Sequence, residues 1–485
     1  MYDPSVEPTV AELTAAYAGP DPGRALAAQY APILLLDARE PFVPLVVGYT
    51  IFRRSVHSPS AHRYVELEQR GKRGTDTAIE YALWWDWDIT HLYELEHVWV
   101  YLDANGEVIH AEGSRHGRYR KMLAHGEPPL TGSRLTLYAE AGKHSLAPVR
   151  SWLDTLAPLT RKLCLRHAGL EGVLITWLFR GIIRAKSPEA DRLVHTHLER
   201  YAFEPSLDFA QVFTVPESSL VPWPALFAWI PRRVTWWVYT LRRAIPPGQR
   251  RFFRIARRGA SAYAPENTLA AIAIAAQHGA DLVKLDVQHT ADGVPVILHG
   301  QELSRTTNGH GPASQRTLRE LKALDAGNGE RIPTLEEAIA SCREHQLGLY
   351  LELESEAVIV PVVRAIQRHH LYDRVGVCSY HPDWLALVRA LEPRITTAVL
   401  LGSPAADAVT LAGAAGAQYV HPAWEAAPGA PHVPPSEEWT RRVREAGLGI
   451  ICEHERCLCD LAALRQVGVD GICSSAPDTL MPRPG

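Results

Sequence analysis

The sequence lacks any long apolar run and any large excess of charge of one sign. No stretch approaches the roughly 18 consecutive apolar residues of a membrane-spanning helix. The opening residues, MYDPSVEPTVAEL, have neither the basic start nor the apolar segment of a secretory signal. The net charge is only −4, whereas nucleic-acid-binding proteins usually carry a strongly basic surface. These absences predict a cytoplasmic protein that does not bind nucleic acid.

Cysteine is also scarce. Seven cysteines in 485 residues, an odd number in a long chain, fit a reducing compartment better than a disulfide framework. A single core rarely grows to this length, so we expect two or more domains.

The pattern of apolar segments divides the chain into three parts. Residues 1–150 contain short strand-like runs, and Asp103-Ala104-Asn105-Gly106 between two of them is typical of a β-hairpin turn, which predicts a mainly β domain. Residues 151–250 predict a helical connector rich in Trp and Arg, which ends near Pro246-Pro247-Gly248. Residues 251–485 alternate short strands with amphipathic helices. This alternation predicts an α/β fold, a parallel sheet closed into a TIM-type (β/α)8 barrel.

The functional side chains of such barrels lie where the strands end. The first strand, FFRIARRG, ends in Arg257-Arg258-Gly259, and the second contains Lys284-Leu285-Asp286. We interpret PVILHG as the third strand, which ends in His299-Gly300, and LGLYLELE as the fourth, which contains Glu352-Leu353-Glu354.

The ordered segments RRGAS, APENTLAA, LDV, DGVPVILH, RTTNG and IPTLEEA resemble the glycerophosphodiester phosphodiesterase family. The resemblance implies hydrolysis of glycerophosphodiesters, a reaction of lipid-headgroup metabolism that yields an alcohol and glycerol 3-phosphate. It also implies a divalent cation (Ca²⁺ or Mg²⁺) on carboxylates, two proton-transferring histidines and an arginine on the phosphate. Carried over by position, His299 transfers protons, Arg258 holds phosphate, and Asp286 and Glu352 are metal ligands.

Four positions depart from the family's pattern. Arg257 replaces a histidine, and a guanidinium cannot act as a general base because it keeps its proton. Lys284 replaces the first carboxylate of Glu-x-Asp, and an ammonium cannot ligate a cation. Gly300 replaces an aspartate, and Glu354 replaces the lysine of Glu-x-Lys.

The changes at positions 284 and 354 compensate each other in charge. The family's lysine at 354 is a glutamate here, and the family's carboxylate at 284 is a lysine. Lys284 could reach the carboxylates and stand where the metal would lie. The cationic groups Arg257, Arg258 and Lys284 equal in number the carboxylates Asp286, Glu352 and Glu354. The sequence therefore predicts a neutral barrel mouth with a weakened metal site, in which the cationic groups would face a substrate phosphate.

Two interpretations of the barrel stay open. One is a phosphoric diester hydrolase of altered chemistry, and the other is a non-catalytic barrel that binds a phosphorylated or lipid-headgroup ligand or acts as a scaffold.

A second group of polar residues lies in the β domain. If its β segments are neighbours, Glu96, His97, His116 and His144 would converge, and that set suits a divalent cation or acid–base chemistry. These segments resemble necrosis-inducing and vacuolar-sorting-type β domains, which implies carboxylates and histidines around a metal. A third interpretation therefore places a metal-dependent hydrolase site here. The alternative is a set of polar residues that pair locally along a strand edge.

Residues 219–245 combine Trp with Arg, a composition that suits the membrane interface and predicts peripheral membrane contact. The alternative is a helix pair packed between the two domains. In either case we expect Pro222, Pro224 and Pro231 to interrupt any long helix.

Overall fold

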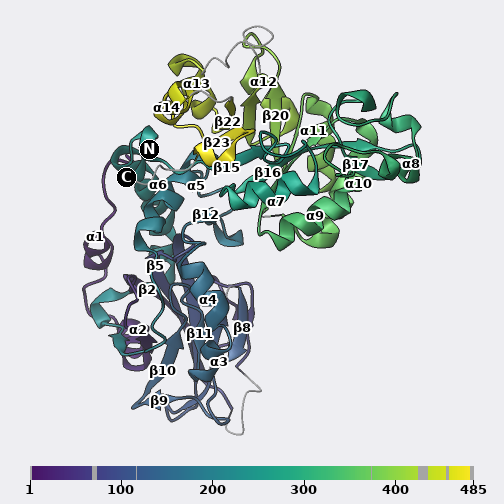
Figure 1. Cartoon of the computed structure of the whole chain (residues 1–485). Coiled ribbons are helices and arrows are strands. Elements are labelled where there is room, and N and C mark those ends of the chain that lie inside the picture. The colour runs from purple at the N-terminus through teal and green to yellow at the C-terminus, as the bar shows by residue number, and fades with distance from the viewer. Residues whose placement is uncertain are drawn as a thin grey trace. The chain divides into compact units, whose positions relative to one another are not determined.

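The computed structural model describes residues 3–67, 74–115, 117–372, 374–423, 435–454 and 458–480. The chain divides into two compact units (Figure 1). The β unit comprises Met1–Lys186 and Ala190–Ile245, and the barrel unit comprises Ser187–Glu189 and Pro246–Gly485. The predicted connector 151–250 therefore forms no unit of its own: most of it packs with the first 150 residues, and the barrel unit resumes at Pro246 of the Pro-Pro-Gly sequence.

The β unit is mainly β, as predicted. Its larger sheet runs β14-β2-β5-β6-β7-β8 with β12 beside β6, its smaller sheet runs β11-β10-β1-β13 with β9 beside β10, and β3 pairs with β4. The strands are β1 (Ile33–Leu36), β2 (Val46–Phe52), β3 (Val56–His57), β4 (Tyr64–Val65), β5 (Thr77–Trp87), β6 (His91–Leu102), β7 (Val108–Arg115), β8 (Arg118–Lys121), β9 (Leu130–Thr131), β10 (Arg134–Ala139), β11 (Leu146–Ala147), β12 (Gly172–Val173), β13 (Gln211–Thr214) and β14 (Leu220–Pro222). The helices are α1 (Val10–Ala15), α2 (Pro22–Tyr30), α3 (Ser151–Asp154), α4 (Ala157–Cys164), α5 (Pro188–Leu198) and α6 (Trp223–Ala244).

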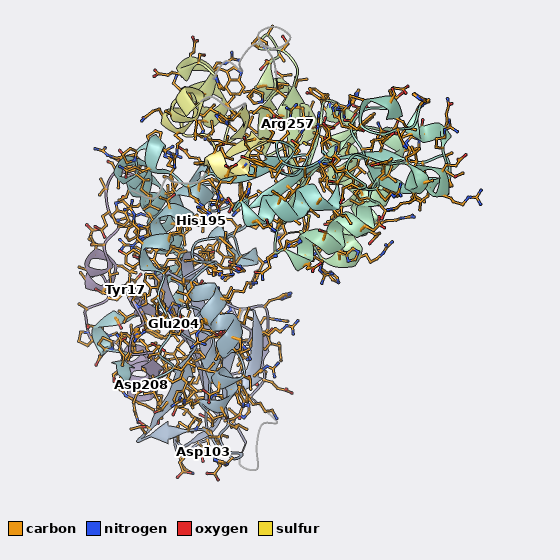
Figure 2. The ribbon with its side chains drawn as sticks, in the orientation of Figure 1. Tyr17, Asp103, His195, Glu204, Asp208 and Arg257 are labelled. Atoms are coloured by element: carbon orange, nitrogen blue, oxygen red, sulfur yellow. The ribbon has the colours of Figure 1, made fainter. Side chains whose placement is uncertain are left out.

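The predicted hairpin turn joins β6 to β7. Asp103, labelled in Figure 2, accepts hydrogen bonds from the backbone N–H groups of Asn105 and Glu107. Gly106 has φ +78°, the left-handed conformation that such turns demand and that glycine adopts without strain.

The Trp/Arg-rich segment is one helix, α6, with Pro231 inside it, so the expected interruption by prolines was wrong. Pro224 lies in the first turn, where no helical N–H is required. Burial of one face, which includes Leu226, Ile230 and Val234, stabilises the helix enough to offset the hydrogen bond lost at Pro231. Trp223 and Trp229 are also buried, so these two rings contact protein rather than solvent or lipid. None of the helices in the described ranges is long and apolar enough to cross a membrane.

Arg233 of α6 is buried in an ion pair with Asp86 of β5. Its Nη2 lies 2.6 Å from Asp86 Oδ2, and its Nε donates to the same carboxylate at 3.1 Å. Its Nη1 lies 2.6 Å from Glu7 Oε1. Both partners Arg233 and Asp86 are almost fully removed from solvent, so neither can be hydrated if the other is lost.

The barrel predicted for residues 251–485 is present. Of the described strands, eight are parallel and close in the order β15-β16-β18-β19-β20-β21-β22-β23, with β23 paired back to β15. They are β15 (Phe253–Arg257), β16 (Leu282–His289), β18 (Gly348–Leu353), β19 (Val375–Ser379), β20 (Thr396–Leu401), β21 (Tyr419–Pro422), β22 (Gly449–His454) and β23 (Gly471–Ser474). The helices are α7 (Leu269–Gln277), α8 (Leu318–Ala323), α9 (Leu335–Glu344), α10 (Ile359–His369), α11 (Pro382–Leu391), α12 (Ala408–Ala415), α13 (Glu437–Glu445) and α14 (Leu458–Val467).

The sequence suggested that PVILHG is the third barrel strand, and this prediction was wrong. The segment forms β17 (Pro295–Ile297), which pairs antiparallel with β16, while LGLYLELE forms β18 and follows β16 in the ring. The reason is the short connection between β16 and β17, which turns at Gly293 with φ +76°. Parallel neighbours need a crossover of roughly a dozen residues or more, whereas an antiparallel hairpin closes with a few.

The Arg233–Asp86 pair yields a stability prediction. Arg233→Met is expected to lower the free energy of unfolding by about 3–5 kcal/mol, because Asp86 is left buried without its cation. The neighbouring Arg232→Met is the matched control, since Arg232 is exposed and its loss is expected to cost less than about 0.5 kcal/mol. Urea unfolding of the full chain measures both values, and equal losses in the two variants would contradict the account.

Candidate functional site

The candidate site lies where the first three barrel strands end. The strand register pairs Arg257 of β15 with Lys284 of β16, and Asp286 of β16 with Glu352 of β18. Arg257 is labelled on the barrel in Figure 2. Arg258 and Asn267 beside it have φ +55° and +59°, uncommon values for residues other than glycine. Such backbone strain tends to be kept at functional sites.

Lys284 lies at the centre of the site. Its Nζ is 2.5 Å from Glu352 Oε2 and 3.9 Å from both Asp286 Oδ1 and Glu453 Oε1. Burial alone would lower the pKa of Lys284, but the carboxylates of Glu352, Asp286 and Glu453 raise it well above its usual value. The side chain is therefore a buried ammonium ion.

Asp286 is fully buried and its two oxygens differ. Oδ2 accepts a hydrogen bond of 2.9 Å from Asn267 Nδ2 and lies 3.0 Å from Arg258 Nε. Oδ1 is buried and accepts no hydrogen bond. Burial opposes ionisation, but Lys284 and Arg258 lower the pKa of Asp286, which therefore carries a full negative charge.

His299 and Glu354 form the outer edge of the site. His299 Nε2 lies 3.6 Å from Glu354 Oε1, longer than a hydrogen bond. Burial lowers the pKa of His299 to about 4, so its imidazole is neutral at pH 7. Burial and the charges of Asp286 and Glu352 raise the pKa of Glu354 to about 7.

Glu453, at the end of β22, is a site carboxylate that the sequence analysis missed. Its Oε2 lies 3.2 Å from Arg257 Nε, and its Oε1 lies 3.4 Å from His421 Nε2. The rule that strand ends carry function could have found it. Glu453 is a fourth carboxylate beside the three cationic groups, so the predicted count of three carboxylates against three cationic groups was incomplete.

The predicted metal ligands do not fit a metal at the family's position. Asp286 and Glu352 are neighbours across the sheet, but Lys284 contacts the Glu352 carboxylate at 2.5 Å. An ammonium and a divalent cation cannot share that place, because their charges repel. A different set, Asp286, His299 and Glu354, offers ligand atoms that all lie within 4.8 Å of one another.

Among the described residues of the set predicted for the β unit, Glu96 and His97 do not converge. Glu96 and His97 are adjacent on β6, so their side chains lie on opposite faces of the sheet. Glu96 accepts a hydrogen bond from Ser114 Oγ, and His97 stacks on Trp99. His144 stacks on Trp85 at a ring distance of 4.6 Å, and His116 lies outside the described residues.

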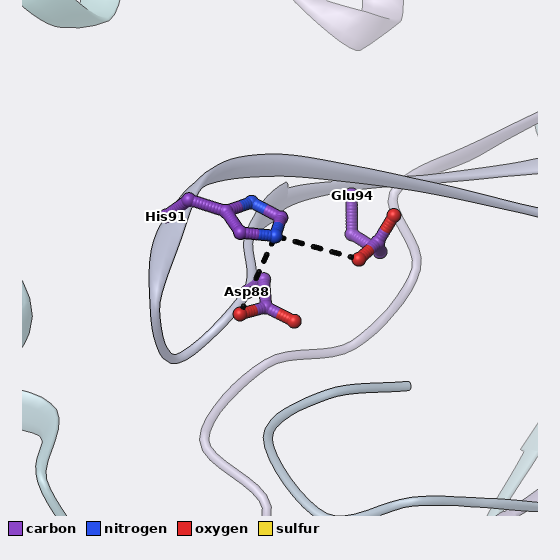
Figure 3. Close-up of side chains that lie close together, drawn as sticks. All are labelled: Asp88, His91 and Glu94. Atoms are coloured by element: carbon purple, nitrogen blue, oxygen red, sulfur yellow. Dashed lines mark ion pairs between the residues drawn. The ribbon is translucent and has the colours of Figure 1, made fainter. Parts of the chain in front are cut away.

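A different cluster forms in the β unit around His91 (Figure 3). Its Nδ1 lies 2.7 Å from the carbonyl oxygen of Tyr93, which can only accept, so Nδ1 carries the proton. Its Nε2 lies 3.7 Å from Asp88 Oδ1, 3.7 Å from Glu94 Oε2 and 3.6 Å from Glu171 Oε2. Tyr93 has φ +60°, which interrupts the regular alternation of side chains along the strand. His91 and Glu94, three residues apart, therefore lie on the same side of the strand.

The charges of this cluster are strongly coupled. Lys143 Nζ donates to Asp88 Oδ1 at 2.8 Å and lies 3.9 Å from Glu171 Oε2. Burial raises the pKa of Glu94 well above its usual value, and the charges of Glu96 and Asp88 raise it further. Burial lowers the pKa of His91, which keeps its imidazole neutral. A neutral imidazole held by a backbone carbonyl, beside carboxylates, is the form in which histidine binds metals.

Comparison with known proteins places the barrel in a family. Residues 258–479 match the Glycerophosphoryl diester phosphodiesterase family. A glycerophosphodiester phosphodiesterase of Caldanaerobacter subterraneus subsp. tengcongensis is 31% identical over 239 residues, which cover 47% of this chain and 95% of that protein. Glycerophosphodiester phosphodiesterase 1 of Mus musculus is 37% identical over 157 residues, 30% of this chain and 47% of the mouse protein. The chain therefore belongs to the glycerophosphodiester phosphodiesterase family.

The coverage differs among these relatives. The chain spans about half the length of the mouse protein and of its Bos taurus counterpart. A solved structure of an Oleispira antarctica phosphodiesterase in complex with the product sn-glycerol-3-phosphate is similar at 30% identity and a TM-score of 0.43, over 47% of this chain and 94% of that one.

The buried ammonium gives a second stability prediction. Lys284→Met is expected to lower the free energy of unfolding by about 3–5 kcal/mol, because it leaves adjacent carboxylates without their cation. Lys322→Met is the control, since the Lys322–Glu337 pair is partly exposed and worth about 1 kcal/mol or less. A loss of less than about 1 kcal/mol for Lys284→Met in urea unfolding would show that Lys284 does not bind these carboxylates.

Proposed function

We propose that the barrel mouth binds the phosphate group of a glycerophosphodiester or a related lipid-headgroup phosphodiester, and that it does not run the family's ordinary metal-dependent hydrolysis. The observation that carries the proposal is the contact of 2.5 Å between Lys284 Nζ and Glu352 Oε2. In the family, carboxylate ligands would bind a cation at this position. Here the ammonium group of Lys284 occupies that position.

The cationic groups of the mouth support phosphate binding. Arg258 is retained from the family's motif and lies at the strand end, 3.0 Å from Asp286. Arg257 keeps 27% of its side chain exposed and Arg305 keeps 43%, so both guanidinium groups can reach a ligand in solvent. Guanidinium groups match the geometry of phosphate oxygens and form charge-assisted hydrogen bonds with them.

The proton-transfer groups argue against the ordinary mechanism. Hydrolysis of a phosphodiester by general acid–base catalysis needs one group to accept a proton and another to supply one. His299 is neutral and can accept a proton, but the second histidine position holds Arg257, which cannot exchange its proton at working pH. Binding therefore fits this residue set better than the ordinary reaction does.

The test measures ligand binding and turnover on the full chain. Glycerol 3-phosphate and glycerophosphocholine are expected to bind in the presence of chelator, and Arg258→Ala is expected to weaken binding by about 10- to 100-fold because one or two charge-assisted hydrogen bonds are lost. Arg441→Ala is the matched control, since Arg441 is 62% exposed on α13 and pairs only with Glu445 of the same helix in the described structure. No release of glycerol 3-phosphate from glycerophosphocholine is expected with Ca²⁺, Mg²⁺ or chelator.

Metal-dependent turnover that disappears in His299→Ala would contradict this proposal and show a working hydrolase. Turnover gained only in the double variant Lys284→Glu with Arg257→His would support it, because that variant restores a carboxylate and a proton-transfer group. If neither glycerol 3-phosphate nor glycerophosphocholine binds, the proposal is also contradicted.

The His91 cluster supports a second candidate function, a metal site in the β unit. The observation that favours it is the Nε2 atom of His91, which faces three carboxylates at 3.6–3.7 Å while its other nitrogen is held by a carbonyl. Lys143 neutralises one of the three carboxylates, Asp88, and a bound cation would replace the proton that burial favours on Glu94. This cluster differs from the set predicted from the sequence, which was Glu96, His97, His116 and His144.

Calorimetric titration of the full chain with Mn²⁺ tests this second site. His91→Ala is expected to reduce the number of bound ions by one, because it removes the nitrogen ligand. His57→Ala, an exposed histidine of the same unit, is expected to leave that number unchanged. An unchanged stoichiometry in His91→Ala would exclude the site.

A further inference from the structure

We infer that the exchange of charge between positions 284 and 354 has moved a divalent-cation site to the outer edge of the barrel mouth, where Asp286, His299 and Glu354 are its ligands. The inference deepens the proposed function, since it names a second ligand of the same mouth. The family's pattern has a carboxylate at 284 and a lysine at 354, and this chain has the reverse. The inner place is therefore occupied by an ammonium, and the outer place has gained a carboxylate.

The geometry of the three side chains fits one ion. Ligand atoms from Asp286, His299 and Glu354 all lie within 4.8 Å of one another. An ion with bonds of about 2.0–2.3 Å holds pairs of ligand atoms about 3–4.5 Å apart, so only small movements are needed. His299 and Glu354 already lie 3.6 Å apart at Nε2 and Oε1 without a hydrogen bond between them.

Asp286 supplies the independent observation that the site is built for a ligand. Its side chain is fully buried, and its Oδ1 accepts no hydrogen bond. Buried carboxylate oxygens are normally satisfied, so such an atom requires an explanation. Asn267 and Arg258 hold the other oxygen, and they fix the orientation of the carboxylate as outer partners of metal ligands do.

The local charges leave room for a cation. Four carboxylates, Asp286, Glu352, Glu354 and Glu453, lie with three cationic groups, Lys284, Arg257 and Arg258, and the fourth cationic group of the mouth, Arg305, pairs with Glu266. Lys284 is committed to Glu352 at 2.5 Å and Arg257 to Glu453 at 3.2 Å, so Glu354 and Oδ1 of Asp286 are the least neutralised acceptors.

The donor set also changes which ion the site prefers. Ca²⁺ and Mg²⁺, the ions implied by the family, prefer oxygen ligands alone. Two carboxylates and an imidazole suit Mn²⁺ or Zn²⁺ better, because these ions accept nitrogen as well as oxygen. Water or a phosphate oxygen would complete the coordination on the solvent side of the mouth.

Electron paramagnetic resonance with Mn²⁺ alone tests the inference on the full chain. The starting variant carries His91→Ala, which removes the competing site of the β unit. This protein is expected to bind one Mn²⁺ with modulation from a directly bonded ¹⁴N nucleus. His299→Ala is expected to abolish that modulation, and Glu354→Gln to weaken binding by at least about tenfold.

Glu356→Gln is the matched control, because Glu356 is an exposed carboxylate two residues after Glu354, and it is expected to leave Mn²⁺ affinity within about threefold. Glu352→Gln distinguishes the two places for the ion, since Glu352 contacts Lys284. The reverse result, loss of binding in Glu352→Gln and none in Glu354→Gln, would place the ion at the family's position and overturn the inference. Bound Mn²⁺ without a nitrogen signal, or no bound Mn²⁺, would also overturn it, and neither result depends on how well Glu352→Gln folds. Binding of glycerol 3-phosphate in chelator reports the proposed function separately.

Discussion

The ion pair between Lys284 and Glu352 determines what the barrel mouth can do. A buried ammonium is stable only beside carboxylates, and those carboxylates are the groups on which the family's metal chemistry depends. Once Lys284 contacts Glu352 at 2.5 Å, Glu352 is no longer available as a metal ligand, and Asp286 turns to Arg258 and Asn267 for one of its oxygens. The other oxygen of Asp286, Oδ1, is then left buried without a hydrogen-bond donor.

Each unit contains a buried lysine, and the two lysines differ in the carboxylates that surround them. In the barrel, Lys284 lies among three carboxylates and is closest to Glu352. In the β unit, Lys143 bonds one carboxylate, Asp88, at 2.8 Å, and the neutral His91 faces that carboxylate and two others. In both units, the carboxylates that the lysine leaves unneutralised are those proposed to hold a cation.

Much of the barrel was predictable from the sequence, because alternation of strands and helices and the position of residues at strand ends are local signals. The contact of Lys284 with the carboxylates followed from charge alone. The interpretation of PVILHG as a barrel strand failed because a strand's apolar pattern does not reveal its direction, which here was set by the short turn at Gly293. Glu453 was missed because it comes 100 residues after the end of the strand that carries Glu352, and only closure of the ring brings the two residues together.

The site of the β unit was less predictable. Acidic residues and histidines suggested a metal, but the predicted set rested on the β segments being neighbours. Glu96 and His97 are adjacent on one strand, so their side chains lie on opposite faces. The cluster depends instead on the left-handed backbone of Tyr93, which no sequence pattern announces for a tyrosine. In α6, likewise, the prolines suggested a break, and the buried face of the helix outweighed them.

The most direct test of the exchanged charges is a crystal structure of the full chain grown with Mn²⁺, in which anomalous scattering locates the ion. A peak bounded by Asp286, His299 and Glu354 is expected, with Lys284 Nζ still in contact with Glu352. A peak between Asp286 and Glu352, with the Lys284 side chain turned away, would contradict the proposed relocation of the cation site.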